Sequence, residues 1–410
     1  MLQPIKFLSG IAVLIFLITS CGNNSGENEK TTPKQDSLLS TDTLVEETPV
    51  PKETKPAEKP KTIKQSTSPE AKQPPMQKVI PPRLKISNPL SSWVDNATKK
   101  RILDFVKAVT TKGSASYVDF DKRIAVFDND GTLWSEKPTY FQIEFVLYRI
   151  RQMAPNHPEW KRDKLIKAAM NHDLETLRKK YGANGLGRLL QITQSGMTPE
   201  AFEKTVVEWL DNARHPETGH LFKEMVYRPM IELIDYLEAE NFQVYLVTGA
   251  ELDFVRSMSE ELFHIPRNHI IASFQKLDYS QENGKIVLTK SPEHSQVIDG
   301  PEKVVGIQQI IGMKPLLAAG NSDGDLAMLS WCASRRGKSL PILIHHTDSI
   351  REWAYDKNTR TGRASKILMD AIQNSWLVVD MAADWKYIYY NEKNEAGATV
   401  SSTDKEQENE

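Results

Sequence analysis

Residues 127–133 read Phe-Asp-Asn-Asp-Gly-Thr-Leu and continue the short apolar run Ile124–Phe127. An apolar run without alternation is typical of a strand that is covered on both faces. Side chains two residues apart leave an extended strand on the same face, so Asp128 and Asp130 can address one ion or one reacting group. Ligands bind at the carboxyl ends of strands in open α/β sheets, which makes this end a candidate site. The alternative is a solvated acidic turn, because Asp-Gly is ordinary turn chemistry.

Further apolar runs follow at intervals along the chain. They are Phe242–Val247, Leu316–Ala319, Ile342–Ile344 and Leu377–Val379. Helical patterns separate them, and in Pro229–Ala239 the apolar residues recur at helical spacing behind a first-turn proline. Strands that alternate with helices predict an α/β fold with a doubly wound parallel sheet.

The segment 137–227 interrupts this alternation, because it shows helical patterns and no convincing strand. Its clearest predicted helices are Phe141–Arg151, Arg162–Lys180 and Pro199–Asn212. Thr198 and Pro199 supply an N-cap and a first-turn proline for the last of them. We therefore predict a helical insertion between the first and second strands of the sheet.

Polar residues also follow the later strands. Val247-Thr248-Gly249 ends the second run, Lys303 lies in Pro301-Glu302-Lys303-Val304, and residues 320–325 read Gly-Asn-Ser-Asp-Gly-Asp. Together with the Asp128-x-Asp130-x-Thr132 string, these elements resemble motifs I to IV of the haloacid dehalogenase superfamily, in the required order. The resemblance covers about residues 90 to 390. It implies a Rossmann-like core, and the helical insertion is similar to the cap of phosphoserine phosphatases and their relatives.

The resemblance also implies roles for individual residues. Asp128 would attack phosphorus, Asp130 would act as general acid and base, and Thr248 and Lys303 would hold the phosphate oxygens. Mg²⁺ would lie between the Asp128 carboxylate, the Asp130 backbone carbonyl and side chains of motif IV. An aspartate at position 130 resembles the phosphatase and phosphotransferase branches rather than those that cleave carbon–halogen bonds.

Motif IV departs from the family pattern. The family usually has aspartate directly after the glycine, and this chain has Asn321. An amide oxygen can bind a hard cation but brings no charge. We expect Asp325 to be the charged ligand with Asn321 nearby, and Asp323 stays open as the alternative.

Other polar residues are weaker candidates for the pocket. Glu136 follows motif I and either receives a cationic group of the substrate or is plainly solvated. The His345-His346-x-Asp348 string lacks a complementary cluster, so we expect it to shape the pocket rim or to pack. Four arginines on helical segments can meet a substrate anion, although surface charge is the commoner role: Arg149, Arg151, Arg188 and Arg228.

The first residues are typical of a secretory signal. Lys6 precedes the apolar run Phe7–Ile18, which is short for a membrane span. Ile18-Thr19-Ser20-Cys21 resembles a bacterial lipoprotein box, which implies that Cys21 carries lipid and anchors the protein to a membrane. The location implied is the bacterial cell envelope, periplasmic or associated with the outer membrane. The other cysteine, Cys332, then has no partner and is expected to be a buried hydrophobe.

These patterns predict one folded unit between polar termini. The expected divisions are a lipoprotein signal peptide at 1–21, a disordered tether rich in Pro, Lys, Glu and Thr at 22–88, a core at 89–136 and 228–390, a cap at 137–227 and a flexible tail at 391–410. The 52 basic and 54 acidic residues balance, so nothing favours a nucleic-acid partner. We expect a Mg²⁺-dependent phosphomonoester hydrolase acting on a small phosphorylated molecule. The alternatives are a phosphotransferase of the same fold and a catalytically silent phosphate-ligand binding lipoprotein. No pattern specifies the oligomeric state.

Overall fold

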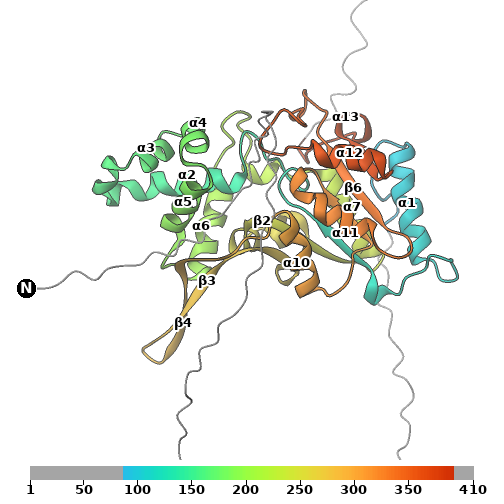
Figure 1. Ribbon diagram of the computed structural model, residues 1–410, viewed down its shortest axis with the longest axis horizontal. Helices are drawn as coiled ribbons and strands as arrows, with labels where there is room; N and C mark the ends of the chain where they lie inside the picture. The colour runs from blue at the N-terminus through green and yellow to red at the C-terminus, as the bar shows by residue number, and fades with distance from the viewer. Residues whose placement is uncertain (1–85, 392–410) are drawn as a thin grey trace, which may run out of the picture. The chain divides into compact units, whose positions relative to one another are not determined.

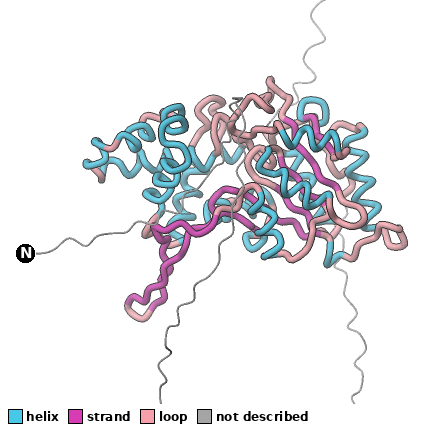
Figure 2. Tube along the Cα trace, in the orientation of Figure 1, coloured by secondary structure: helices cyan, strands magenta, loops and turns pink. Residues whose placement is uncertain are grey.

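The computed structural model describes residues 86–391, which lie within one compact unit. Its centre is a seven-stranded sheet in the order β4-β3-β2-β1-β5-β6-β7 (Figures 1 and 2). The strands are β1 (Ile124–Phe127), β2 (Gln243–Glu251), β3 (Ile270–Glu282), β4 (Lys285–Gln296), β5 (Leu317–Gly320), β6 (Leu340–His345) and β7 (Leu377–Asp380). All neighbouring pairs are parallel except β3–β4. The predicted α/β fold class is confirmed.

Alternate residues of β1 enter different apolar clusters, because successive side chains point to opposite faces. Ala125 and Phe127 pack with residues of α1 (Ala97–Thr110) and α7 (Arg228–Ala239). Ile124 and Val126 pack on the other face. The helices there are α10 (Pro301–Ile310), α11 (Leu326–Ala333) and α12 (Lys366–Gln373). Helices on both faces bury the sheet, and Cys332 lies fully buried in the second cluster as predicted.

Three short helices complete the part of the chain around the sheet. They are α8 (Leu252–Arg256), α9 (Ser259–Phe263) and α13 (Met381–Asp384). Within residues 86–391, no helix has the length and apolar character needed to cross a bilayer. The predicted signal peptide, Cys21 and nearly all of the tether and tail lie outside the described residues.

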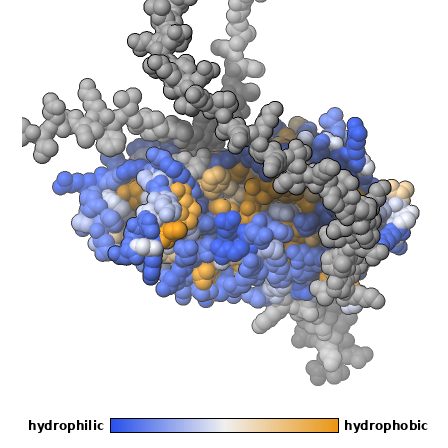
Figure 3. All heavy atoms as spheres, turned by 90° about the horizontal axis from the view of Figure 1, so that it is seen from below, coloured by the Kyte–Doolittle hydropathy of each residue, from blue (hydrophilic) through white to orange (hydrophobic). Residues whose placement is uncertain are grey.

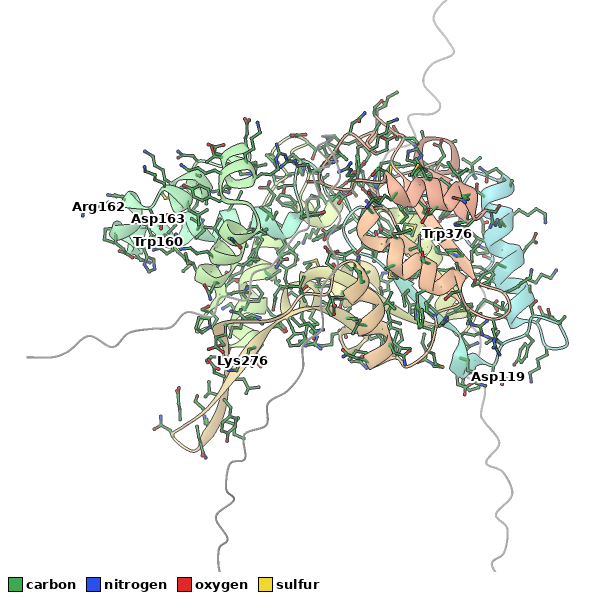
Figure 4. All side chains as sticks on the ribbon, viewed as in Figure 1. Asp119, Trp160, Arg162, Asp163, Lys276 and Trp376 are labelled. Atoms are coloured by element: carbon green, nitrogen blue, oxygen red, sulfur yellow. The ribbon has the colours of Figure 1, made fainter. Side chains whose placement is uncertain are left out.

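Residues 137–227, which lie between β1 and α7, are mainly helical and contain an apolar cluster of their own. Their helices are α2 (Phe141–Met153), α3 (Lys164–Met170), α4 (Leu174–Thr176), α5 (Gly182–Gln194) and α6 (Pro199–Asn212). Trp160 and Asp163 lie at the outer end of this helical segment (Figure 4). Trp376 lies on the other side of the picture, beside the helices that cover the sheet. The single helix predicted over Arg162–Lys180 is wrong. The chain turns at His172, which has a φ of 55°, and Asp173 caps a new helix.

The long hairpin β3–β4 was not predicted, and Figure 1 shows it projecting from the sheet. Its strands are joined by Asn283 and Gly284, whose φ angles of 50° and 79° suit a two-residue hairpin turn. At its base, the amide of Gly196 donates to the carbonyl of Lys290, and the amide of Lys290 donates to the carbonyl of Met197, each at 2.8 Å. These two bonds fasten β4 to the α5–α6 connection.

The side chain of Lys290 strengthens this attachment from inside. It is fully buried and lies 2.6 Å from Glu251 Oε1 and 2.5 Å from Asp253 Oδ2. Its ammonium also lies 4.8 Å from the centre of the Phe202 ring on α6. A buried ammonium needs such partners, because an unpaired charge in the interior is costly. Lys290 therefore joins the hairpin, α8 and the helical segment at one point.

Candidate active site

The predicted site residues come together at the carboxyl edge of the sheet. Asp128 and Asp130 follow β1, Thr248 lies near the end of β2, and Lys303 lies on α10. Asn321 and Asp325 follow β5, which neighbours β1. One pocket is lined by Asp128, Asp130, Thr248 and Lys303 together with residues of the helical segment. The topology alone therefore gathers four separated stretches of sequence.

Lys303 lies at the centre of this arrangement. Its Nζ is 2.5 Å from Asp128 Oδ1 and 2.6 Å from Asp325 Oδ1. All three side chains are buried. Burial alone would lower the pKa of Lys303, but the two carboxylates outweigh it and raise the pKa above its ordinary value. The ammonium therefore stays charged and bridges the two strand ends.

One ammonium does not balance the carboxylates around it. Burial, and then repulsion from Asp325, raises the pKa of Asp128 well above its usual range. Asp130 adds a third acidic group to the site. Among residues 86–391, no three His, Cys, Asp or Glu side chains already lie in ligating geometry. The oxygen-rich set of Asp128, Asp130, Asn321 and Asp325 nevertheless has the chemistry of a hard-cation site, and its surplus negative charge fits a divalent ion.

Asp130 has a different environment from Asp128. Its Oδ1 accepts a hydrogen bond of 2.9 Å from the indole Nε1 of Trp134, which is fully buried. Burial raises the pKa of Asp130 to about 6. A carboxyl group titrating near neutral pH can both give and take a proton. Trp134 lies in the core and orients Asp130.

Thr248 lies near the end of β2, where it still pairs with Ala272 of β3 and directly precedes an irregularity in that pairing. It is buried, lines the pocket, and its Oγ1 accepts the amide hydrogen of Ala250 at 3.1 Å. That bond leaves its hydroxyl hydrogen able to donate to an oxygen in the pocket. The position suits contact with a phosphate.

The acidic residues after β5 divide into two roles. Asp323 accepts hydrogen bonds from Ser365 Oγ and from the amides of Lys366 and Ile367 at the start of α12. Asp325 is fully buried, contacts Lys303, and its Oδ2 accepts the amide of Asn321 at 3.0 Å. The structure therefore places Asp325 in the site and engages Asp323 as a helix cap.

Glu136 is buried in the pocket wall rather than solvated. Its Oε1 accepts hydrogen bonds from Tyr355 OH at 2.7 Å and from Asn321 Nδ2 at 2.6 Å. Burial raises the pKa of Glu136 well above its usual range. The side-chain nitrogen of Asn321 thus faces Glu136. The side-chain oxygen of Asn321 stays available to other partners.

A buried polar network that the sequence did not reveal supports motif I from behind. His346 Nε2 donates to the carbonyl of Gly131 at 2.8 Å, and its Nδ1 lies 3.2 Å from Glu352 Oε2. Glu352 Oε1 accepts from Ser135 Oγ at 2.8 Å and from Tyr227 OH at 2.7 Å. Burial would raise the pKa of Glu352, but His346 and hydrogen bonds from the Trp353 amide and the Tyr227 hydroxyl hold it below its usual value. His346 thus fixes the backbone of Gly131, which lies between Asp130 and Thr132.

The four candidate arginines do not line the pocket. Arg188 pairs with Asp163 at 2.5 Å, and Arg228 pairs with Glu232 at 3.2 Å. Arg149 contacts the sulfur of Met197, and Arg151 lines a separate hollow. Sequence reasoning missed the pocket residue Asp299, which precedes the Gly300-Pro301 start of α10. A proline at the first position of a helix indicates where the helix begins, so the sequence contained a signal for the loop that carries Asp299.

Comparison with known families agrees with this geometry. The family of haloacid dehalogenase-like hydrolases matches residues 125–330, from β1 to α11. The chain belongs to this family. The haloacid dehalogenase-like match spans the predicted residues of motifs I to IV, from Asp128 to Asp325, and it confirms the prediction of an enzyme of the hydrolase class.

Solved structures similar to this haloacid dehalogenase-like chain include a conserved protein of unknown function from Anaerococcus prevotii. It is 14% identical with a TM-score of 0.45, over 70% of this chain and 94% of that one. A protein of unknown function from Bordetella pertussis is 16% identical with a TM-score of 0.40, over 63% and 99%. A phosphoserine phosphohydrolase-like protein from Francisella tularensis is 15% identical with a TM-score of 0.32, over 54% and 87%. No curated protein matches the sequence.

Proposed function

We propose that this hydrolase cleaves small phosphomonoesters with Mg²⁺ through an aspartyl-phosphate on Asp128. The observation that carries the proposal is the buried contact of 2.5 Å between Lys303 Nζ and Asp128 Oδ1, with Asp130 two residues further on. A carboxylate and a phosphate ester repel each other, so attack requires positive charge beside the nucleophile. Lys303 supplies part of that charge.

In the first step, a carboxylate oxygen of Asp128 attacks phosphorus, and the bond from phosphorus to the ester oxygen breaks. Asp130, oriented by Trp134, gives its proton to the departing oxygen, so the alcohol leaves neutral. Lys303 and Thr248 hold the phosphoryl oxygens as their charge redistributes.

In the second step, water attacks the phosphorus of the aspartyl-phosphate. Asp130, now a carboxylate, accepts a proton from that water, and the Asp128 carboxylate is released with inorganic phosphate. The residues that would hold Mg²⁺ are Asp128, Asp130, Asn321 and Asp325. The chemistry supplied by the bound ion is positive charge that offsets the repulsion between nucleophile and phosphate.

The helical segment between β1 and β2 is the place where phosphoserine phosphatases and their relatives carry a cap. Leu186, Leu190 and Gln194 of α5 line the same pocket as the catalytic carboxylates. A cover of this kind excludes bulk water during reaction and selects the leaving group. We assign this role to residues 137–227, the cap.

The test is hydrolysis of p-nitrophenyl phosphate by the full chain in detergent, with Mg²⁺ and with EDTA. Turnover that requires Mg²⁺ and falls by at least about a thousandfold in Asp128→Asn supports the proposal. A matched control is Asp104→Asn on α1, whose carboxylate is exposed and does not line the pocket. Unchanged turnover in Asp128→Asn contradicts the aspartyl-phosphate route.

The proposal includes attachment to the bacterial cell envelope through lipid on Cys21. It is supported by the apolar run Phe7–Ile18 and the lipobox-like residues before Cys21. Cys21→Ser is expected to release the protein from isolated membranes, measured by its distribution after centrifugation. A variant that stays bound after washing with high salt contradicts lipid attachment.

A further inference from the structure

The far end of the active-site pocket is built mainly from amide and apolar side chains. Gln142 comes from α2, Gln194 from α5, Gln275 from β3 and Gln296 from the end of β4. Apolar residues from the same elements lie among them: Ile143, Leu186, Leu190 and Phe274. Because the catalytic groups lie at the sheet edge, this end faces the organic part of an ester substrate.

The charges of the pocket are strongly one-sided. Beyond the catalytic aspartates, Glu136, Glu251 and Asp299 line it. Lys303 is the single basic side chain among the lining residues, and Asp128 and Asp325 already engage it. A second anion on the substrate would lose its hydration here and meet no counter-charge. The pocket therefore disfavours carboxylates and second phosphates on the leaving group.

In two of the glutamines, no donor makes a hydrogen bond to the side-chain oxygen. The Oε1 atoms of Gln194 and Gln275 are buried and have no hydrogen-bond partner. The Gln275 amide nitrogen donates to the carbonyl of Ser291, which fixes the orientation of that carboxamide. A buried acceptor without a donor costs about 1–3 kcal/mol, so a ligand that brings hydroxyl or N–H donors recovers stability that an apolar ligand does not.

The size of the pocket limits the ligand as well. Its cavity volume is about 260 Å³. Sites for drug-sized ligands measure roughly 300–1,000 Å³. A phosphate with an organic part of a few carbons therefore suits this cavity better than a nucleotide.

We propose that the pocket selects phosphomonoesters of small alcohols that carry hydroxyl or ammonium donors and no second anionic group. This inference rests on the proposed phosphomonoester hydrolase activity and deepens it. Gln194 and Gln275 accept from the donors of the leaving group. A competing substrate that carries a carboxylate meets Asp299 there and no unpaired basic side chain among the lining residues.

The first test compares glycerol 3-phosphate with 3-phosphoglycerate, using the full chain and Mg²⁺. The two esters share a three-carbon skeleton and differ in a terminal hydroxymethyl group or carboxylate. We expect kcat/KM to be at least about tenfold higher for glycerol 3-phosphate, because the binding site holds no partner for the carboxylate. O-Phosphoethanolamine, tested beside them, distinguishes ammonium from hydroxyl donors. Equal or reversed values for the first pair overturn the inference.

The second test places a cation at the far end of the pocket. Gln194→Lys is expected to lower the ratio of kcat/KM for glycerol 3-phosphate over 3-phosphoglycerate by about tenfold, because it supplies the missing counter-charge. Gln308→Lys on α10 adds the same charge at an exposed position outside the pocket and serves as the matched control. An identical ratio in both variants and the wild type overturns the assignment of Gln194.

Failure of the inference is distinguishable from failure of the proposed function. Turnover of p-nitrophenyl phosphate that depends on Asp128, combined with a preference for 3-phosphoglycerate, overturns the inference alone. Absence of turnover with every ester, in protein that retains its circular dichroism spectrum, overturns the proposed function and the inference with it.

Discussion

The two ends of the pocket differ in how their polar groups are satisfied. At the sheet edge, the Lys303 ammonium is paired with Asp128 and Asp325, and Asp130 is bonded to Trp134. At the cap end, buried carbonyl oxygens of Gln194 and Gln275 have no donor. The first end is preorganised for one reaction, whereas the second is completed by a ligand. The face drawn in Figure 3 is mainly hydrophilic, with groups of apolar residues between the polar ones.

The largest effect that distinguishes the two ends is expected from Asp130→Asn. Loss of the acid should lower kcat for glycerol 3-phosphate by about 10²–10⁴-fold, because its alkoxide leaves poorly without a proton. p-Nitrophenyl phosphate should lose much less, since nitrophenolate needs little protonation. Steady-state kinetics with both esters measures the difference. Equal losses for both esters contradict the acid role.

A smaller effect separates the two aspartates after β5. Asp325→Asn should weaken activation by Mg²⁺ by at least about tenfold, because it removes a charged oxygen from the site. Asp323→Asn should leave the Mg²⁺ dependence in place and cost about 1 kcal/mol of unfolding free energy through the cap of α12. Mg²⁺ titrations and urea unfolding of both variants check the pair. The reverse pattern would make Asp323 the ligand.

His346→Phe tests how the catalytic end is held from behind. It removes the donor to Gly131 and leaves Glu352 without its ring partner, so we expect a loss of about 1–3 kcal/mol in unfolding free energy and a fall in kcat. His346→Gln keeps a donor and should recover part of kcat. The KM for p-nitrophenyl phosphate should change little in either variant. A loss of stability with unchanged kcat would show that His346 only supports the fold.

The smallest effect concerns the base of the cap. His215 Nε2 donates to the carbonyl of Lys137 at 2.6 Å, and its Nδ1 accepts amides of Glu217 and Thr218. Burial lowers the pKa of His215 below 6.5, so the unfolded chain binds the proton more readily. The stability from neutral His215 is complete above pH 6.5 and is lost as pH falls through the lowered pKa. His215→Asn should flatten the dependence of the unfolding free energy on pH below about pH 6.5. An unchanged slope contradicts this.

The sheet edge was more predictable from sequence than the cap end. Asp128 and Thr248 end apolar runs that resemble strands, so their convergence follows from parallel topology. The long strands β3 and β4 were not predicted, although Asn283-Gly284 between them is a strong hairpin signal. Their exposed apolar residues, such as Tyr279 and Ile286, blur the contrast between inner and outer faces.

The residues that contact each other in the network behind motif I lie far apart in the sequence, so no local sequence pattern indicates their contacts. Tyr355 reaches Glu136 across 219 residues of sequence, and His346 reaches Gly131 across 215. Spacing and periodicity report neighbours along one helix or strand, and these contacts depend on how a late loop folds over an early one. The same limit applies to Gln194 and Gln275, because an isolated glutamine has no signature.

Gly131 has a consequence for the evolution of this chain. Its φ is 74°, and a Cβ built there would lie 2.0 Å from Asn321 Nδ2 and 2.5 Å from Glu136 Oε1. Any larger residue meets two separate obstacles, backbone strain and collision. Substitutions of Asn321 or Glu136 can therefore accumulate without any change at position 131. A change at position 131 is opposed by the backbone strain even after both neighbours are altered.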